Sequence, residues 1–413
     1  MSGIRFWIRA FSVAAGGLLI SGIGHGVCGA ETADVPTDHT ALVRQLGAPS
    51  HHQRERAARE LIKVGLPAKP ALLQAARDVD LEIRLGAQRV LVAIVQADFD
   101  ARIAAFLDPA SPPPDHLLAG WDLFQKQVES GISARQLFAE MIRTEAELLD
   151  AVEDSPETLI ARSAARIQAL TSHLVQAVGN DQPVCEASLA TLLFVGSQLN
   201  ATSLSGDKAR DLSVFNIRLF SLLNTQSMQR VVLQDHHSPL LRQLLVRWLE
   251  RGFPESQHAY AMQLVLKYEL GESGLEMARQ VLRDPHAPPS SIPYAAIVIA
   301  RFGGPDDVCH LPRHLQDQRV FHTWSNLQLK KEPIGIQVRD VVLAMLIRAT
   351  GQNPESFGYD LLEPAPETLY CIWTFGFLED TKRTAALTKW ESWRKAHGAE
   401  FHLTETAENS HRP

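Results

Sequence analysis

A short motif that recurs after 30 residues constrains the fold of this chain more than any other feature. The pattern R-x-x-A-x-x-x-L occurs at residues 54–61 and again at residues 84–91. The same offset relates two further apolar pairs, Leu42 with Leu72 and Ile62 with Val92. A fixed period of this length is typical of stacked helical units, because a single helix pair cannot bury its own apolar face and needs a neighbour.

The residues around each copy are those that begin and end helices. Asp80 stands where the N-cap of a helix belongs, and Ser50 takes the same place in the first copy. Between the copies, Gly65 follows one predicted helix and Pro67 opens the next. The pattern therefore predicts two helix pairs between residues 38 and 107, with the alanines of the motif where helices approach closely.

The two copies resemble HEAT repeats, most closely the short HEAT-like kind described in phycobilisome lyases. The resemblance rests on the motif and its offset, and it assigns residues 31–107 to N-terminal HEAT-like repeats. It implies an all-α fold in which helix pairs stack into an α-solenoid-like array, an α-α superhelix. The alternative is two ordinary amphipathic helix pairs in a non-repetitive bundle.

The repeat pattern returns near the C-terminus. Within residues 337–346, Arg339 takes the place of Arg84 and Leu346 the place of Leu91, while Val342 replaces the alanine. No aspartate stands at the N-cap position, which leaves the start of this helix open. Residues 286–398 are therefore predicted to hold C-terminal HEAT-like repeats, closed by a capping helix over residues 380–397.

Between the two ends the chain reads as helical but shows no alignable repeat. Three consecutive prolines end the segment 108–114, which is predicted to be a stiff linker. The middle region, residues 115–285, contains further predicted helices at 184–200, 207–223, 239–251 and 256–271. Strand signals are nearly absent, because the run 231–233 is too short to form a sheet. Residues 399–413 are predicted to be a disordered tail.

The first 30 residues have the character of a secretory signal peptide. Arg5 and Arg9 precede an uncharged apolar stretch, and small residues up to Ala30 suit cleavage there. We therefore expect export to the periplasm or the extracellular space; a retained membrane anchor is the alternative. Cys28 also raises a lipoprotein interpretation, which the preceding residues 25–27 do not favour. Cleavage removes two arginines and no acids, which takes the net charge from −7 to −9.

Cysteine and charge exclude several classes of function. After cleavage three cysteines remain, Cys185, Cys309 and Cys371, and they form no C-x-x-C pattern. An odd number of distant cysteines argues against a disulfide framework and favours buried free thiols, although one pair could still form a bridge. The acidic balance and the lack of a basic run argue against nucleic acid as a partner. Membrane contact is expected only through a retained N-terminal segment.

The sequence contains no motif of a known catalytic centre, and no cofactor is expected. One candidate metal cluster joins Cys309, His310 and His314, with His322 nearby, because histidines four residues apart on a helix can share a zinc ion. Pro312 between them makes a plain helix start the simpler interpretation. The adjacent pairs His51-His52 and His236-His237 are predicted to lie in solvent-facing turns.

The segment from His322 to Pro333 is longer than a packing turn needs, and long connections between paired helices often carry binding. Its candidate partner-binding residues are His322, Trp324, Asn326, Gln328 and Lys330. The alternative is a loop that folds back onto its own repeats.

These observations lead to one functional expectation and two rivals. The expectation is an exported, non-catalytic scaffold that binds another protein, since helical arrays of this kind usually bind. The first rival is an enzyme, because the resemblance to phycobilisome lyases implies handling of a bilin chromophore or another small molecule. The second is a structural module of an envelope assembly.

Overall fold

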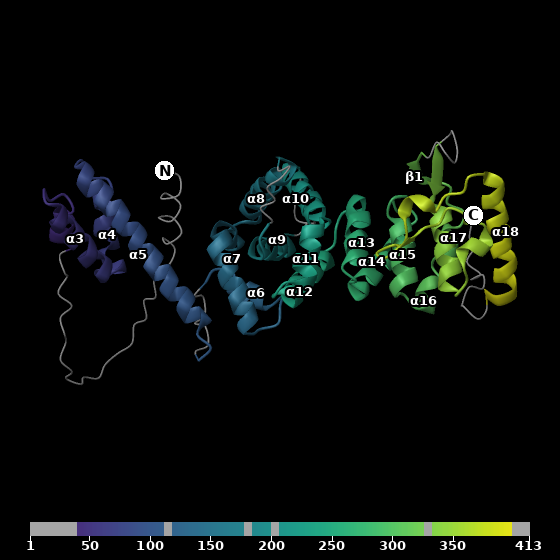
Figure 1. The fold of residues 1–413 in the computed structure, drawn as a ribbon, viewed down its shortest axis with the longest axis horizontal. Helices are drawn as coiled ribbons and strands as arrows, with labels where there is room; N and C mark the ends of the chain where they lie inside the picture. Colours follow the sequence, from purple (N-terminus) through teal and green to yellow (C-terminus); the bar gives the residue numbers. More distant parts are fainter. Residues whose placement is uncertain (1–38, 111–117, 177–183, 200–205, 326–332, 399–413) are drawn as a thin grey trace, which may run out of the picture. The chain divides into compact units, whose positions relative to one another are not determined.

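The computed structural model describes residues 39–110, 118–176, 184–199, 206–325 and 333–398, and most of them are helical (Figure 1). The chain divides into two compact units, one up to Ala119 and one from Gly120. The first contains α2 (Thr40–Gln45), α3 (His51–Val64), α4 (Lys69–Ala75) and α5 (Leu81–Leu107). The predicted signal peptide, the prolines of the linker and the predicted tail lie outside the described residues.

The first unit holds the two predicted helix pairs. Helix α2 packs on α3, α4 packs on α5, and α3 packs on α5 across the pairs. Ala57 and Ala87 are both fully buried at these contacts, as the motif predicts. Leu91 is 5% exposed, whereas its neighbour Val92 is 51% exposed. Positions 30 residues apart therefore have matching environments within this unit.

The arginine of the motif makes the same contact in both copies. Arg54 donates from Nη1 to the carbonyl oxygen of Ala48 at 2.8 Å, and Arg84 donates from Nη1 to that of Asp78 at 2.7 Å. Each acceptor lies six residues before its arginine, so the guanidinium ties the preceding turn to the helix. The caps differ, since Asp80 accepts from the amides of two residues of α5 and Ser50 makes no side-chain cap.

The second unit is a longer run of helices with short connections. Its α-helices are α6 (Trp121–Gln125), α7 (Ile132–Asp150), α8 (Pro156–Gln176), α9 (Glu186–Gln198), α10 (Asp207–Leu223), α11 (Gln226–Gln234), α12 (Ser238–Glu250), α13 (His258–Lys267), α14 (Gly271–Arg283), α15 (Ile292–Phe302), α16 (Pro305–Val308), α17 (Val338–Ala349) and α18 (Asp380–His397). The predicted helices at 207–223 and 380–397 coincide with α10 and α18. The run 231–233 lies in α11.

Two small antiparallel pairs of strands interrupt the helices. Strand β1 (Val320–Trp324) pairs with β2 (Ile334–Gln337), and β3 (Pro364–Ala365) pairs with β4 (Leu369–Tyr370). The segment predicted as a polar loop therefore begins as the first strand of a hairpin. The physical reason is that β1 is rich in β-branched and aromatic residues and meets buried Ile334 and Ile336 on its partner.

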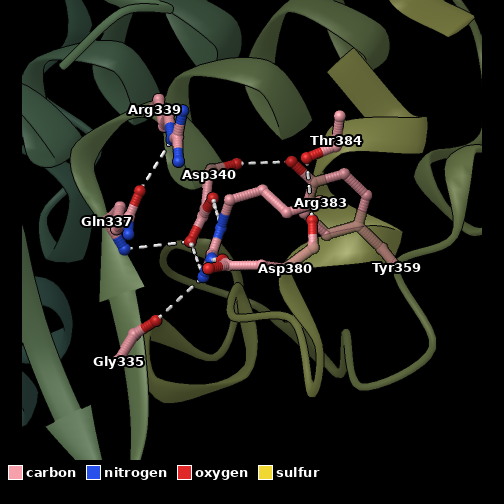
Figure 2. Close-up of polar contacts among 8 residues, drawn as sticks. All are labelled: Gly335, Gln337, Arg339, Asp340, Tyr359, Asp380, Arg383 and Thr384. Atoms are coloured by element: carbon pink, nitrogen blue, oxygen red, sulfur yellow. Dashed lines mark hydrogen bonds and ion pairs between the residues drawn. The ribbon is translucent and has the colours of Figure 1, made fainter. Parts of the chain in front are cut away.

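A buried ion pair fastens the last helix to the second unit (Figure 2). Arg383 of α18 donates from Nε to Asp340 Oδ1 at 2.8 Å and from Nη2 to the carbonyl oxygen of Gly335 at 3.2 Å. Asp340 is 1% exposed and also accepts from the amide of Gln337, which closes a capping box at the start of α17. The helix start that the sequence leaves open is thus fixed three residues inside the helix.

Helices that could cross a membrane were sought among the described residues, and none is both long and apolar enough.

Candidate binding groove

Two adjoining clefts follow helix α12 in the second unit, and we call them together the α12 groove. The larger has a volume of about 1040 Å³ and lies between the C-terminal end of α12, the turn before α13 and the first half of α14. The smaller, of about 790 Å³, lies between α12 and the segment after α6. The clefts share Val246, Glu250 and Leu270, so they form one continuous depression.

The larger cleft is strongly acidic. Five exposed glutamates line it, Glu250, Glu255, Glu269, Glu272 and Glu276. No lysine or arginine is among the described residues that line this cleft. Its one histidine, His258, lies against the carbonyl oxygen of Phe253 with Nε2 at 3.0 Å. Burial lowers the pKa of His258, although that contact and the charge of Glu255 oppose the shift, so the ring adds no positive charge at neutral pH.

Ion pairs compensate part of this negative charge from outside the larger cleft. Arg301 contacts Glu269 at 2.8 Å, and Arg279 contacts Glu276 at 3.4 Å. Glu255 and Glu272 have no ion pair with any described residue. Glu269 also has a φ of 55°, in the left-handed region that side chains rarely adopt. A charged residue held in this conformation beside a cleft is a pattern seen where backbone strain accompanies function.

Close packing fixes the walls of the larger cleft. A Cβ added at Gly274 of α14 would overlap the side chain of Val265 on α13, so these two helices touch without a side chain between them. On the opposite wall, the ring of Phe253 lies 5.0 Å from the guanidinium carbon of Arg251. Arg251 is held in turn by the side chain of Asn216, and burial lowers its pKa to about 10, so it stays charged. The groove is therefore preformed.

The smaller cleft has mixed charge. Lys126, Arg242 and Arg247 line it together with Glu129 and the shared Glu250. Arg247 and Glu250 form an ion pair at 3.0 Å where the two clefts meet. The α12 groove thus passes from an acidic end to an end with a slight positive balance.

The predicted partner-binding loop is described only in part. His322 and Trp324 lie in β1, whereas Asn326, Gln328 and Lys330 lie outside the described residues. His322 is exposed, and Trp324 is half-buried with its indole nitrogen lacking a partner among the described residues. None of the residues that line the α12 groove comes from this hairpin.

The predicted cluster of cysteine and histidines does not converge. His314 is buried and its Nε2 lies 3.0 Å from the carbonyl oxygen of Leu282, so this ring completes the packing of α14. Pro312 starts a 3₁₀ turn in place of the helix that would align His310 with His314. The described cysteines are all free thiols; however, Cys185 and Cys309 are exposed and Cys371 half-buried, so the expectation of buried thiols was wrong.

One other group of potential metal ligands does converge among the described residues. Ligand atoms of Glu140, Glu186 and His237 all lie within 4.8 Å of one another. The prediction that His237 faces solvent was wrong, since it is 3% exposed and His236 alone of the pair is exposed. Burial raises the pKa of Glu186, with the charges of Asp235 and Glu140 adding to the shift and the amide of His237 opposing it; burial lowers the pKa of His237.

Sequence reasoning missed both the acidic cleft and this convergent group. The cleft had a usable signal, since Glu269, Glu272 and Glu276 follow helical spacing around the start of α14. The convergent group had none, because its members are far apart in the chain and meet only when α7, α9 and α12 pack together.

Comparison with protein-family models, with curated proteins and with solved structures yields no match for this chain. The groove and the convergent group therefore stand on their geometry alone.

Proposed function

We propose that this protein is a binding scaffold that holds a positively charged segment of another protein in the α12 groove. One observation supports this most directly, which is the lining of the larger cleft by five glutamates without a lysine or arginine among its described residues. A surface of one sign of charge attracts and orients a partner of the opposite sign.

The size and composition of the groove favour a protein segment over a small molecule. The larger cleft alone is at the upper end of the range of about 300–1000 Å³ typical of small-molecule pockets, and the smaller cleft extends it. Apolar side chains of Leu249, Phe253, Leu270 and Met277 lie among the glutamates. Such a surface can bury the aliphatic part of lysine and arginine while carboxylates pair with their charged ends.

The preformed walls add to this argument. A partner that binds to rigid helices does not have to order them, so less of the interaction free energy is lost on binding. We extend the proposal to an exported protein, with residues 1–30 as the signal peptide and a HEAT-like array as the scaffold.

The proposal is tested with labelled peptides of equal length that are rich in lysine and arginine, neutral, or rich in glutamate. Fluorescence anisotropy at low salt should show binding of the cationic peptide and weakening as salt is added, because screening reduces attraction between exposed charges. The double variant Glu255→Gln/Glu272→Gln should bind roughly 2- to 30-fold more weakly, since each exposed charge contributes about 0.2–1 kcal/mol.

A matched control separates the groove from net charge. Glu147→Gln/Glu363→Gln removes two exposed carboxylates that do not line the α12 groove, and it should leave affinity within about twofold of the original. Equal losses in both double variants would reduce the effect to overall charge. Failure of the cationic peptide to bind at low salt would refute the proposal.

A further inference from the structure

We propose that Glu140, Glu186 and His237 form a binding site for a zinc-class divalent metal ion. Each residue comes from a different element of the second unit: Glu140 from α7, Glu186 from the first turn of α9, and His237 from the N-cap of α12. Helix α9 packs against both α7 and α12, which brings the three side chains together (Figure 1).

The histidine is the observation that distinguishes this group from a chance cluster of acids. Its ring is 3% exposed, and Nδ1 is buried without a hydrogen-bond partner among the described residues. A buried polar nitrogen without a partner costs roughly 1–3 kcal/mol, so native structures rarely leave one unused. A bound cation coordinated by the imidazole would remove that cost.

The carboxylates also lack compensation. Neither Glu140 nor Glu186 has an ion pair with a described lysine or arginine, although their oxygens approach each other within 4.8 Å. Glu145, one and a half turns further along α7, shows the opposite arrangement, because Arg166 binds it through two hydrogen bonds of 2.7 Å. The chain thus supplies a counter-charge to one buried acid of α7 and none to the neighbouring pair.

The geometry fits a metal ion after small side-chain movements. In a tetrahedral zinc site with bonds of about 2.0–2.2 Å, ligand atoms lie roughly 3.4 Å apart. The three ligand atoms already lie within 4.8 Å of one another, and Glu140 is exposed, so its side chain can rotate inward. Glu186 accepts the amide of His237 at 3.0 Å with Oε1, which leaves Oε2 for a cation.

The donor set selects the metal. One imidazole with two carboxylates suits zinc, and calcium and magnesium prefer oxygen ligands alone. Three protein ligands leave a position open, which water or a group from a partner would fill. The ion would join three helices, and it is independent of the charge of the α12 groove.

The test is zinc titration of the whole chain, freed of metal with a chelator and made without a histidine tag. Calorimetry should show one equivalent of zinc and little heat with magnesium or calcium. Glu140→Gln and His237→Gln should each weaken zinc binding by at least about 10-fold, because even outer-shell changes have effects of this size. Hydrogen exchange should slow in α7, α9 and α12 when zinc is added.

Neighbouring residues provide the controls. Glu147→Gln lies on the same helix and His236→Gln is the adjacent exposed histidine, so both should bind zinc as the original protein does. Glu140→Gln carries the test even if His237→Gln does not fold, because Glu140 is exposed. Equal weakening by His236→Gln, unchanged binding in Glu140→Gln, or no zinc equivalent in the original protein would overturn the site.

Discussion

The two N-terminal copies of the arginine motif and its C-terminal copy begin alike and are stabilised differently. In the first unit, Arg54 and Arg84 each reach back to a carbonyl oxygen six residues earlier. At the C-terminal copy, Arg339 donates from Nε to the side chain of Gln337 at 2.6 Å, and a strand precedes the helix. A shared helix motif therefore does not determine what leads into the helix.

The sources of stability differ in the same way. The helix pairs of the first unit share a continuous set of small apolar contacts, so no single residue dominates. The C-terminal copy places Asp340 in the interior and depends on one arginine from another helix to balance it. Removing one partner of a buried pair costs far more than the pair contributes, because the remaining charge stays in an apolar surrounding.

The largest expected effect tests that dependence. Arg383→Met should lower the free energy of unfolding of the second unit by about 3–5 kcal/mol, because Asp340 is left buried without a counter-charge. Urea denaturation followed by hydrogen exchange in α17 and α18 would measure it. Lys382→Met is the matched control, since it removes the exposed pair with Asp360 and should cost about 0–1 kcal/mol. Equal costs would show that burial of Asp340 is not the cause.

A somewhat smaller effect is expected in the first unit. Leu91→Ala should cost about 2–5 kcal/mol, as large-to-small changes in cores do. Val92→Ala changes the next residue, which is half exposed, and should cost well under 1 kcal/mol. Exchange of amides in α3 and α5 is the appropriate measurement, since it reports on this unit separately. A neutral Leu91→Ala would mean that the shared layer contributes little.

The smallest effect separates the copies most sharply. Arg54→Ala and Arg84→Ala should each cost about 0.5–1.5 kcal/mol through the lost bond to the preceding turn. Arg339→Ala should cost less, because it frees no carbonyl oxygen. Arg77→Ala, an exposed arginine whose side chain has no described partner, sets the baseline. Faster exchange of turn amides in the two N-terminal variants alone would support the comparison, and a loss of the same size in Arg339→Ala would contradict it.

Sequence reasoning performed well wherever local periodicity decides the structure. It predicted α10 and α18 to the residue and placed the helix pairs of the first unit, because the spacing of apolar residues and the capping residues specify helices locally. It was wrong about β1, since the pairing that makes Val320–Trp324 a strand depends on a partner ten residues away.

The candidate sites were less predictable for the same physical reason. His237 reads as a turn residue in the sequence, and it becomes buried because α9 and α12 pack over it. The acidic cleft gathers Glu250 from one helix, Glu255 from a turn and Glu272 from another helix. Neither site has a spacing that is visible along the chain, because both are created by packing between helices.

Gly274 gives the α12 groove a one-way response to inheritance. Since hydrogen is the smallest side chain, every replacement at this position moves α14 away from α13, and none can bring the two helices closer. Lineages that descend from this sequence can therefore shift this wall outward by a single codon change. Drawing it inward would require coordinated changes in both helices, which makes the present separation of the helices a lower limit that is easily left and hard to pass.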